Sequence, residues 1–245
     1  MFKLIVLSLL TFLSFATYAK NIEGGTIIEA YGGSSTAGVT AFRKGNGKLI
    51  NVVTQGSEIN YLRELLNKKY GNNIKVINRG RPSAQAIELL NGTYRYKKDG
   101  VWTEQMKLSK AKLIILNFAT NDARHYHFKD AKPDYVLSPD QYEKVMKELI
   151  TIARENGKQV LLQEPHPLCG RAEKWDVSPY SARLEYLSKT MSVPLVNQYQ
   201  RIQGMPSWQR MMAPDCIHPS DALYKIKAEE TFKVLDANFS NLLAR

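Results

Sequence analysis

The sequence lacks any feature that would divide it into parts. Its 245 residues contain no internal repeat, no low-complexity segment and no linker rich in proline, glycine or serine. Repeat arrays and chains of several linked domains are therefore excluded. Residues 20–245 are long enough for a single domain with a substantial core.

Cysteine is scarce, with only Cys169 and Cys216 in the whole chain. In an oxidising compartment an even pair favours a disulfide, whereas two buried thiols are the alternative, because the sequence does not give their distance. A bridge would fix the loop that contains Cys216.

Histidine is scarce too, with four in the chain. His125 and His127, with Asp122, resemble metal ligands, but no third or fourth ligand follows at a suitable spacing. We therefore expect a loop position for them, and neither a metal nor another cofactor. His166 follows a predicted strand, where a substrate contact and a structural role are both open.

Acidic residues are outnumbered, 23 against 34 lysines and arginines, which gives a formal net charge of +11. This charge suits anionic surroundings, such as an acidic polysaccharide or peripheral association with an anionic cell envelope. It would also suit nucleic acid, but the basic residues are scattered and form no recognisable nucleic-acid module. We expect no nucleic-acid partner.

The N-terminus has the pattern of a secretory signal peptide. Lys3 precedes a short apolar run over residues 4–13, and Ala19 supplies a small residue at the cleavage point. The run is short for a membrane span, although an uncleaved anchor is the alternative. No cysteine follows Ala19, which argues against a lipoprotein. The pattern predicts residues 1–19 as a signal peptide and a secreted or periplasmic domain over residues 20–245.

Strand and helix patterns alternate along that domain. Apolar runs predict strands at residues 26–28, 74–77, 112–117, 160–162 and 194–196, and capped amphipathic patterns predict helices over 57–70, 85–90, 138–156, 178–190 and 222–242. Residues 39–42 read as the continuation of a short helix, and 43–56 as an irregular loop. This order predicts a three-layer α/β/α sandwich with a central parallel sheet, whose function lies at the carboxyl ends of the strands.

Polar loops follow several of these strands and supply complementary chemistry. Ser34 stands in the glycine-rich turn after the first strand, where a helix N-terminus offers N–H groups to a developing anion. A serine needs a base to take its proton, and a carboxylate three residues before a histidine can orient its ring, as in Asp215 and His218. Asn121 offers an amide to an oxyanion. We expect these side chains to share one crevice with the loop over residues 80–84.

The order of these motifs resembles that of the SGNH hydrolases, the GDSL-type esterase and lipase superfamily. The first block, Gly-Asp-Ser-x-Thr-x-Gly, is echoed by residues 32–38, the third, Gly-x-Asn-Asp, by 119–122, and the fifth, Asp-x-x-His, by 215–218. The resemblance implies a flavodoxin-like fold with Ser34 as nucleophile, His218 as base and Asp215 as its orienting carboxylate. It further implies Asn121 as a side-chain oxyanion donor.

The chain departs from the family pattern at supporting positions. Gly33 stands in place of the aspartate and Ala119 in place of a glycine. The second block, Asn-x-x-x-x-Gly, corresponds to residues 78–83. Counting puts Ser83 at the position that donates a backbone N–H to the oxyanion, and Gly80 is the other candidate.

These patterns predict a secreted serine esterase that hydrolyses short acyl esters, chiefly acetyl, on a carbohydrate. A lipase, a thioesterase or an O-acetyltransferase would use the same triad, and a silent polysaccharide-binding protein would keep the fold without turnover. The aromatic residues Tyr94, Tyr96 and Trp102 fit either a sugar-stacking rim or a core.

Overall fold

The computed structural model describes residues 25–244, so the predicted signal peptide lies outside the described residues. Its centre is a five-stranded sheet in the order β4-β1-β5-β6-β7, parallel throughout. The strands are β1 (Ile27–Gly32), β4 (Lys75–Asn78), β5 (Leu113–Asn117), β6 (Gln159–Gln163) and β7 (Leu195–Val196). Each expected strand is present, and β5 is buried along its whole length, as its uninterrupted apolar run predicts.

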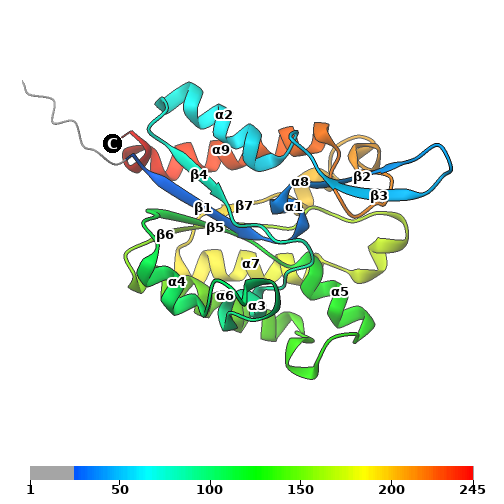
Figure 1. Cartoon of the computed structure of the whole chain (residues 1–245), viewed down its shortest axis with the longest axis horizontal. Coiled ribbons are helices and arrows are strands. Elements are labelled where there is room, and N and C mark those ends of the chain that lie inside the picture. Colours follow the sequence, from blue (N-terminus) through cyan, green and yellow to red (C-terminus); the bar gives the residue numbers. More distant parts are fainter. Residues whose placement is uncertain (1–24, 245) are drawn as a thin grey trace, which may run out of the picture.

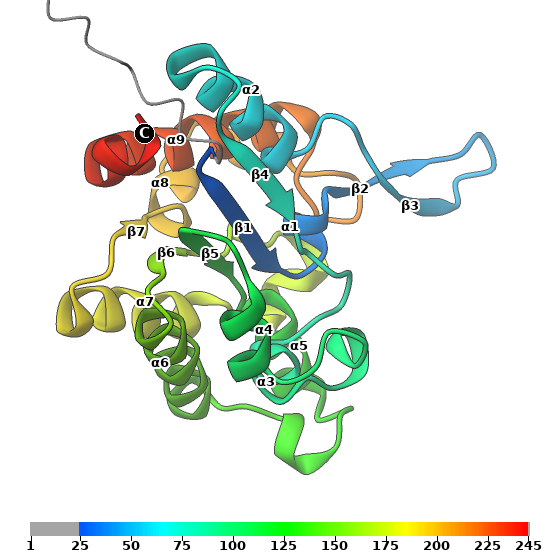
Figure 2. The same cartoon turned by 60° about the vertical axis from the view of Figure 1, so that its left-hand side comes forward.

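Helices cover both faces of this sheet (Figures 1 and 2), which confirms the three-layer fold. One face carries α2 (Glu58–Tyr70) and α9 (Asp221–Leu243), and the other carries α3 (Ala86–Asn91), α4 (Trp102–Leu108), α6 (Pro139–Glu155) and α7 (Ser178–Met191). Side chains alternate between the two layers along β1. Ile28 and Ala30 belong to the core under α2 and α9, whereas Tyr31 belongs to the core on the other side.

Short helices complete the chain: α1 (Ser34–Ala37), α5 (Thr120–Phe128) and α8 (Tyr199–Gln203), with the 3-10 turns η1 (Tyr94–Tyr96), η2 (Pro133–Tyr135), η3 (Gly170–Trp175) and η4 (Trp208–Met211). Within residues 25–244, no helix combines the length and the apolar character that crossing a membrane requires.

Local capping chemistry explains where the longer helices begin. The Ser57 hydroxyl accepts the N–H of Asn60 at the start of α2, and Ser138 forms a capping box with Gln141 at the start of α6. Each arrangement satisfies N–H groups that have no partner in the first turn of a helix. These starts agree with the sequence patterns.

The prediction for residues 39–56 is wrong. Residues 39–56 contain neither a helical continuation nor an irregular loop, but a hairpin of β2 (Val39–Arg43) and β3 (Leu49–Val53), paired antiparallel. In the turn between them, the N–H of Gly47 donates a hydrogen bond to the carbonyl of Lys44, and Gly47 has φ +80°. An Asn-Gly pair favours such a turn, so Asn46 and Gly47 carried the signal for the hairpin.

Of the two alternatives for Tyr94, Tyr96 and Trp102, the core holds for two of the three residues. Tyr96 and Trp102 are buried in the core, where the Trp102 indole N–H donates to the carbonyl of Leu149. Only Tyr94 is exposed, and its ring packs against Tyr135. These aromatic residues stabilise the layer of α3, α4 and α6.

Candidate active site

Ser34 is the first residue of α1, directly after the end of β1. Gly33 precedes the helix with φ −84°, the N–H of Ala37 donates to the carbonyl of Gly33, and Gly38 ends the helix at φ +86°. A glycine allows this left-handed end without strain. The helix is one turn long, and it holds the Ser34 hydroxyl at the carboxyl edge of the sheet, as predicted.

His218 and Asp215 meet Ser34 from the loop before α9. The Ser34 hydroxyl lies 2.9 Å from His218 Nε2, and His218 Nδ1 lies 2.6 Å from Asp215 Oδ2. These three groups form a continuous hydrogen-bonded chain in which the imidazole can accept the serine proton and the carboxylate fixes the tautomer. The structure thus brings together three residues that the motifs singled out.

The carboxylate of Asp215 is held in its ionised form. Burial alone would raise the pKa of Asp215, but hydrogen bonds from the His218 ring and from the N–H groups of Ile217 and His218 outweigh it and lower the pKa. The side chains of Asp215 and His218 are only 9% and 7% exposed. Water therefore competes little for the contact between them.

A disulfide and a buried histidine fix the loop that contains His218. Cys169 and Cys216 are bonded, which confirms the favoured pairing, and the N–H of Cys169 donates to the carbonyl of Cys216. His166 Nε2 donates to the carbonyl of Ile217 at 2.8 Å. Burial, reinforced by the nearby charge of Lys227, lowers the pKa of His166 to about 3, so the ring is neutral. The contact of His166 with the Ile217 carbonyl indicates a structural role, in which His166 holds the backbone next to His218.

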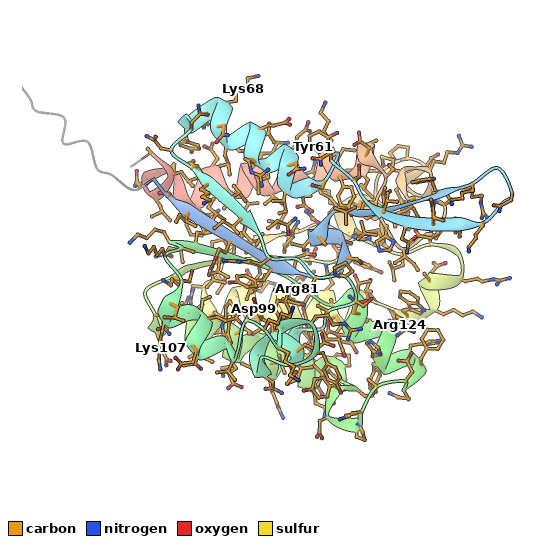
Figure 3. The ribbon with its side chains drawn as sticks, viewed as in Figure 1. Tyr61, Lys68, Arg81, Asp99, Lys107 and Arg124 are labelled. Atoms are coloured by element: carbon orange, nitrogen blue, oxygen red, sulfur yellow. A yellow bond between two sulfur atoms is a disulfide. The ribbon has the colours of Figure 1, made fainter. Side chains whose placement is uncertain are left out.

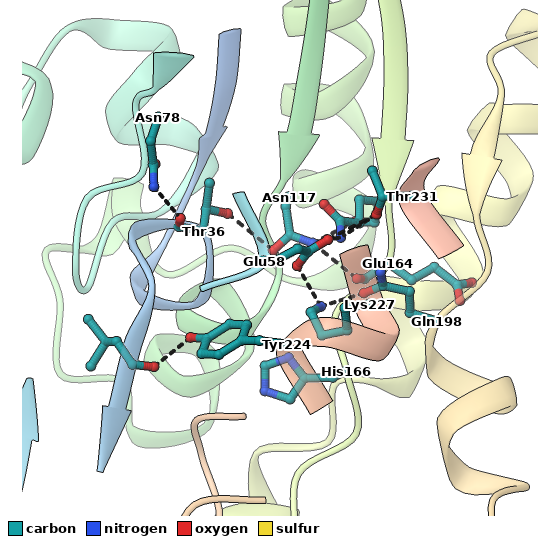
Figure 4. A network of polar contacts seen from close by, with 12 residues as sticks. Thr36, Glu58, Asn78, Asn117, Glu164, His166, Gln198, Tyr224, Lys227 and Thr231 are labelled. Carbon is teal, nitrogen blue, oxygen red and sulfur yellow. Dashed lines mark hydrogen bonds and ion pairs between the residues drawn. The ribbon is translucent and has the colours of Figure 1, made fainter. Parts of the chain in front are cut away.

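A buried polar network lies beneath this loop (Figure 4). The ammonium of Lys227 on α9 contacts Gln198 and lies 3.4 Å from the Glu58 carboxylate at the start of α2. Glu58 also accepts from Gln163 at the end of β6 and from Thr231 on α9. The network ties both helices of one layer to the sheet edge where Ser34 and His218 meet.

Asn121 lies in the first turn of α5, and its side chain points to the edge of the same site. Its amide nitrogen donates to the carbonyl of Ala84 at 3.0 Å. The neighbouring Asp122 is fully buried and accepts the N–H groups of Ala86 and Ala119, so it joins the loop after β4 to the loop after β5. Burial raises the pKa of Asp122 to about 7. His125 and His127 lie in α5 and not in the expected loop, and His125 contacts Asp130 at 2.6 Å, so Asp122 and His125 do not form a shared ligand set.

The two candidates for a backbone oxyanion donor lie in different places. Ser83 lines the same cavity as Ser34 and has φ +63°. Gly80 packs against α1, and its N–H already donates to Asn78 Oδ1 at 2.9 Å. The geometry therefore favours Ser83 over Gly80.

A cavity of about 380 Å³ opens at the Ser34 hydroxyl. Besides Ser34, Ser83, Asn121 and His218, its lining comes from Pro82, Ile217, Arg124 of α5, Trp175 of η3, and Val39, Asn51, Val52 and Val53 of the hairpin. Figure 3 labels Arg124 on α5, on the same side of the molecule as the hairpin and below it in that view. Neither Trp175 nor Arg124 was predicted, because no motif or periodicity distinguishes them.

Residues 30–226 match the sequence profile of the GDSL-like lipase/acylhydrolase family. The chain belongs to this family. It is a carboxylic ester hydrolase, in agreement with the resemblance in its sequence motifs. Among curated proteins, none matches the sequence closely enough to count as a relative.

Solved structures share the fold of this GDSL-like hydrolase. A lipase/acylhydrolase from Enterococcus faecalis has a TM-score of 0.67 at 15% identity, covering 86% of this chain and 96% of its own. An acetylxylan esterase from Geobacillus stearothermophilus has a TM-score of 0.66 at 17% identity, covering 86% and 94%. An aryl esterase from M. smegmatis has a TM-score of 0.63 at 14% identity, covering 86% and 99%.

The two departures from the family pattern have different structural consequences. A Cβ atom added at Gly33 would lie 2.7 Å from the Asn121 amide nitrogen, so the glycine leaves room for this side chain. Ala119 has φ +122°, a conformation that a glycine adopts without strain and an alanine does not. Gly33 thus fits the local geometry of this hydrolase, whereas Ala119 strains it.

Proposed function

We propose that this hydrolase is an exported serine esterase that removes short acyl groups, chiefly acetyl, from a carbohydrate. The hydrogen-bonded chain from Ser34 through His218 to Asp215, opening into the cavity, is the observation that carries the proposal.

The reaction is an acyl transfer to Ser34 and then to water. The Ser34 oxygen attacks the ester carbonyl while His218 Nε2 takes its proton, and His218 returns that proton to the leaving alcohol oxygen as the carbon–oxygen bond breaks. Water, deprotonated by His218, then releases the acid. The negative charge on the carbonyl oxygen is stabilised by the N–H groups of Ser34 and Ser83 and by the Asn121 amide.

The space around Ser34 favours a short acyl group. On the side toward β5, the recess that includes Ser34 and Asn121 holds only about 10 Å³, roughly one water. The acyl group and the alcohol part of the substrate therefore share the larger cavity. There, the Trp175 ring offers a flat apolar surface beside polar side chains, which suits a sugar. The acetylxylan esterase with the same fold acts on such an ester.

Export is supported by the signal-like pattern of residues 1–19 and by the disulfide, since disulfides persist in oxidising compartments. Mass spectrometry of the protein from the periplasm or medium should find Lys20 at the N-terminus. An intact Met1 in exported protein would contradict cleavage.

The decisive test is hydrolysis of p-nitrophenyl esters from acetate to decanoate. We expect turnover of the short esters, and its loss in Ser34→Ala but not in the matched variant Ser35→Ala. A preference for long chains would favour a lipase or thioesterase instead. Absence of Ser34-dependent turnover, with no labelling by a fluorophosphonate, would favour a silent binding protein.

Acetylated xylo-oligosaccharides test the sugar part of the proposal. Trp175→Ala should lower acetate release from these oligosaccharides several-fold while p-nitrophenyl acetate hydrolysis stays near the wild-type rate. Equal effects on both substrates would argue against a sugar contact at Trp175. Acetyl transfer to a second sugar in place of water would identify an O-acetyltransferase.

A further inference from the structure

The hairpin of β2 and β3 combines positive charge with exposed apolar side chains. Residues 39–56 contain three cations, Arg43, Lys44 and Lys48, and no aspartate or glutamate. Among the described residues, none of these cations forms an ion pair. Near the tip, Phe42 and Leu49 are 44% and 37% exposed and lie on opposite faces of the hairpin, because Phe42 pairs with Ile50 and Leu49 with Arg43.

The hairpin projects beyond the layers of the sandwich, and its tip reaches farther out than the helices around it (Figures 1 and 2). Its base is fixed to the active site. The Tyr224 hydroxyl donates to the carbonyl of Val39, and the Thr40 hydroxyl donates to the carbonyl of Pro219, next to His218. A surface that binds the tip would therefore lie beside the opening of the cavity, because Val52 and Val53 of the hairpin line it.

The composition of the tip distinguishes between polymer and lipid. Sugar sites favour flat aromatic rings, but residues 39–56 contain neither tyrosine nor tryptophan. Phe42 and Leu49 instead offer side chains that enter the boundary between head groups and acyl chains. The three cations complement anionic head groups, and long basic side chains extend to them while their stems stay apolar.

We propose that the hairpin docks this protein tip first on an anionic lipid surface, with Phe42 and Leu49 on its two faces entering the head-group boundary and Arg43, Lys44 and Lys48 contacting the lipid phosphates. This inference does not depend on the substrate. It places the opening of the cavity at the membrane surface, within reach of esters on polymers or lipids of that layer.

Co-sedimentation with lipid vesicles tests the proposal. The purified protein is first analysed by mass spectrometry, so that the N-terminus of the sample is known. Vesicles of phosphatidylglycerol and phosphatidylcholine should bind the protein, and pure phosphatidylcholine should bind it far more weakly. A basic residue near an anionic surface strengthens binding roughly fivefold, so Arg43→Glu/Lys44→Glu/Lys48→Glu should weaken it at least ~100-fold. Phe42→Ser/Leu49→Ser should weaken it about tenfold or more.

The control is Lys68→Glu/Lys144→Glu/Lys147→Glu, which changes the net charge equally on the exposed faces of α2 and α6. It should bind vesicles within a few-fold of the wild type. All variants should hydrolyse soluble p-nitrophenyl acetate normally, which reports folding. Equal loss of binding in control and hairpin variants would overturn the proposal, since net charge alone would then explain it. So would hairpin variants that keep vesicle binding but lose binding to a soluble acidic polysaccharide.

Discussion

Replacing Gly33 by alanine should disable the active site even though the change adds only a methyl group. The new Cβ atom would lie 2.7 Å from Asn121 Nδ2, whereas ordinary contacts begin at 3.4 Å, so the amide must move by about 0.7 Å. The movement strains its hydrogen bond to Ala84. Misplacing a catalytic group by about 1 Å costs roughly 100-fold in rate, so we expect a kcat about 100-fold lower, with little change in KM.

Steady-state hydrolysis of p-nitrophenyl acetate measures this effect, and a double-mutant cycle assigns it. Asn121→Ala alone should cost ~100 to 1000-fold, as expected for one oxyanion donor. Adding Gly33→Ala to Asn121→Ala should then change kcat less than about twofold, because the displaced group is already absent. Gly45→Ala, at a position with open space around it, is the matched control and should leave kcat unchanged. A wild-type kcat in Gly33→Ala, or equal losses with and without Asn121, would refute the reasoning.

Three further outcomes are expected. Ala119→Gly should raise the free energy of unfolding in urea by about 1 kcal/mol, because relief of up to about 3 kcal/mol of strain exceeds the losses from glycine flexibility and one buried methyl; a less stable variant would contradict the strain. The pKa of His166 is about 3 in the folded protein and 6.5 in the unfolded chain. As the pH falls from 6.5 to 3, the unfolded chain therefore binds a proton at His166 that the folded protein does not bind. The free energy of unfolding should therefore fall with decreasing pH by up to about 1.4 kcal/mol per unit more in the wild type than in His166→Gln, and parallel curves would contradict this. Asp215→Asn should lower kcat at pH 7 about 10,000-fold with the fold intact, since the ring loses its orienting acceptor; a loss below tenfold would argue against the triad.

The parts of the fold that depend on local chemistry could be predicted from the sequence. The Ser57 cap and the glycine at position 71 bound α2, and the capping box at Ser138 starts α6. The buried run of β5 needs only its own apolar residues to be recognised. The position of Ser34 was predictable because parallel strands place their exits on one edge, whereas His218 lies in the loop before α9 and was identified by the resemblance of residues 215–218 to the fifth block.

Elements that depend on distant partners could not be predicted in this way. Residues 39–43 become a strand only because 49–53 pair with them, and a four-residue apolar pattern alone does not separate helix from strand. Trp102 is a core residue because Leu149 accepts its N–H, 47 residues away. Trp175 reaches the cavity from a 3-10 turn, which has no sequence periodicity to reveal it.

The hydrogen bond between Ser34 and His218 joins positions 184 residues apart. In the proposed mechanism Ser34 is the nucleophile and is synthesised early, but its base His218 follows only after most of the described sheet has been made, in the loop before α9, which packs against α2. If these roles hold, a chain made only as far as β7 carries Ser34 without its base and cannot hydrolyse esters by this mechanism. The appearance of esterase activity during folding would therefore measure when the loop of His218 packs beside Ser34, an event that joins the two ends of the described domain.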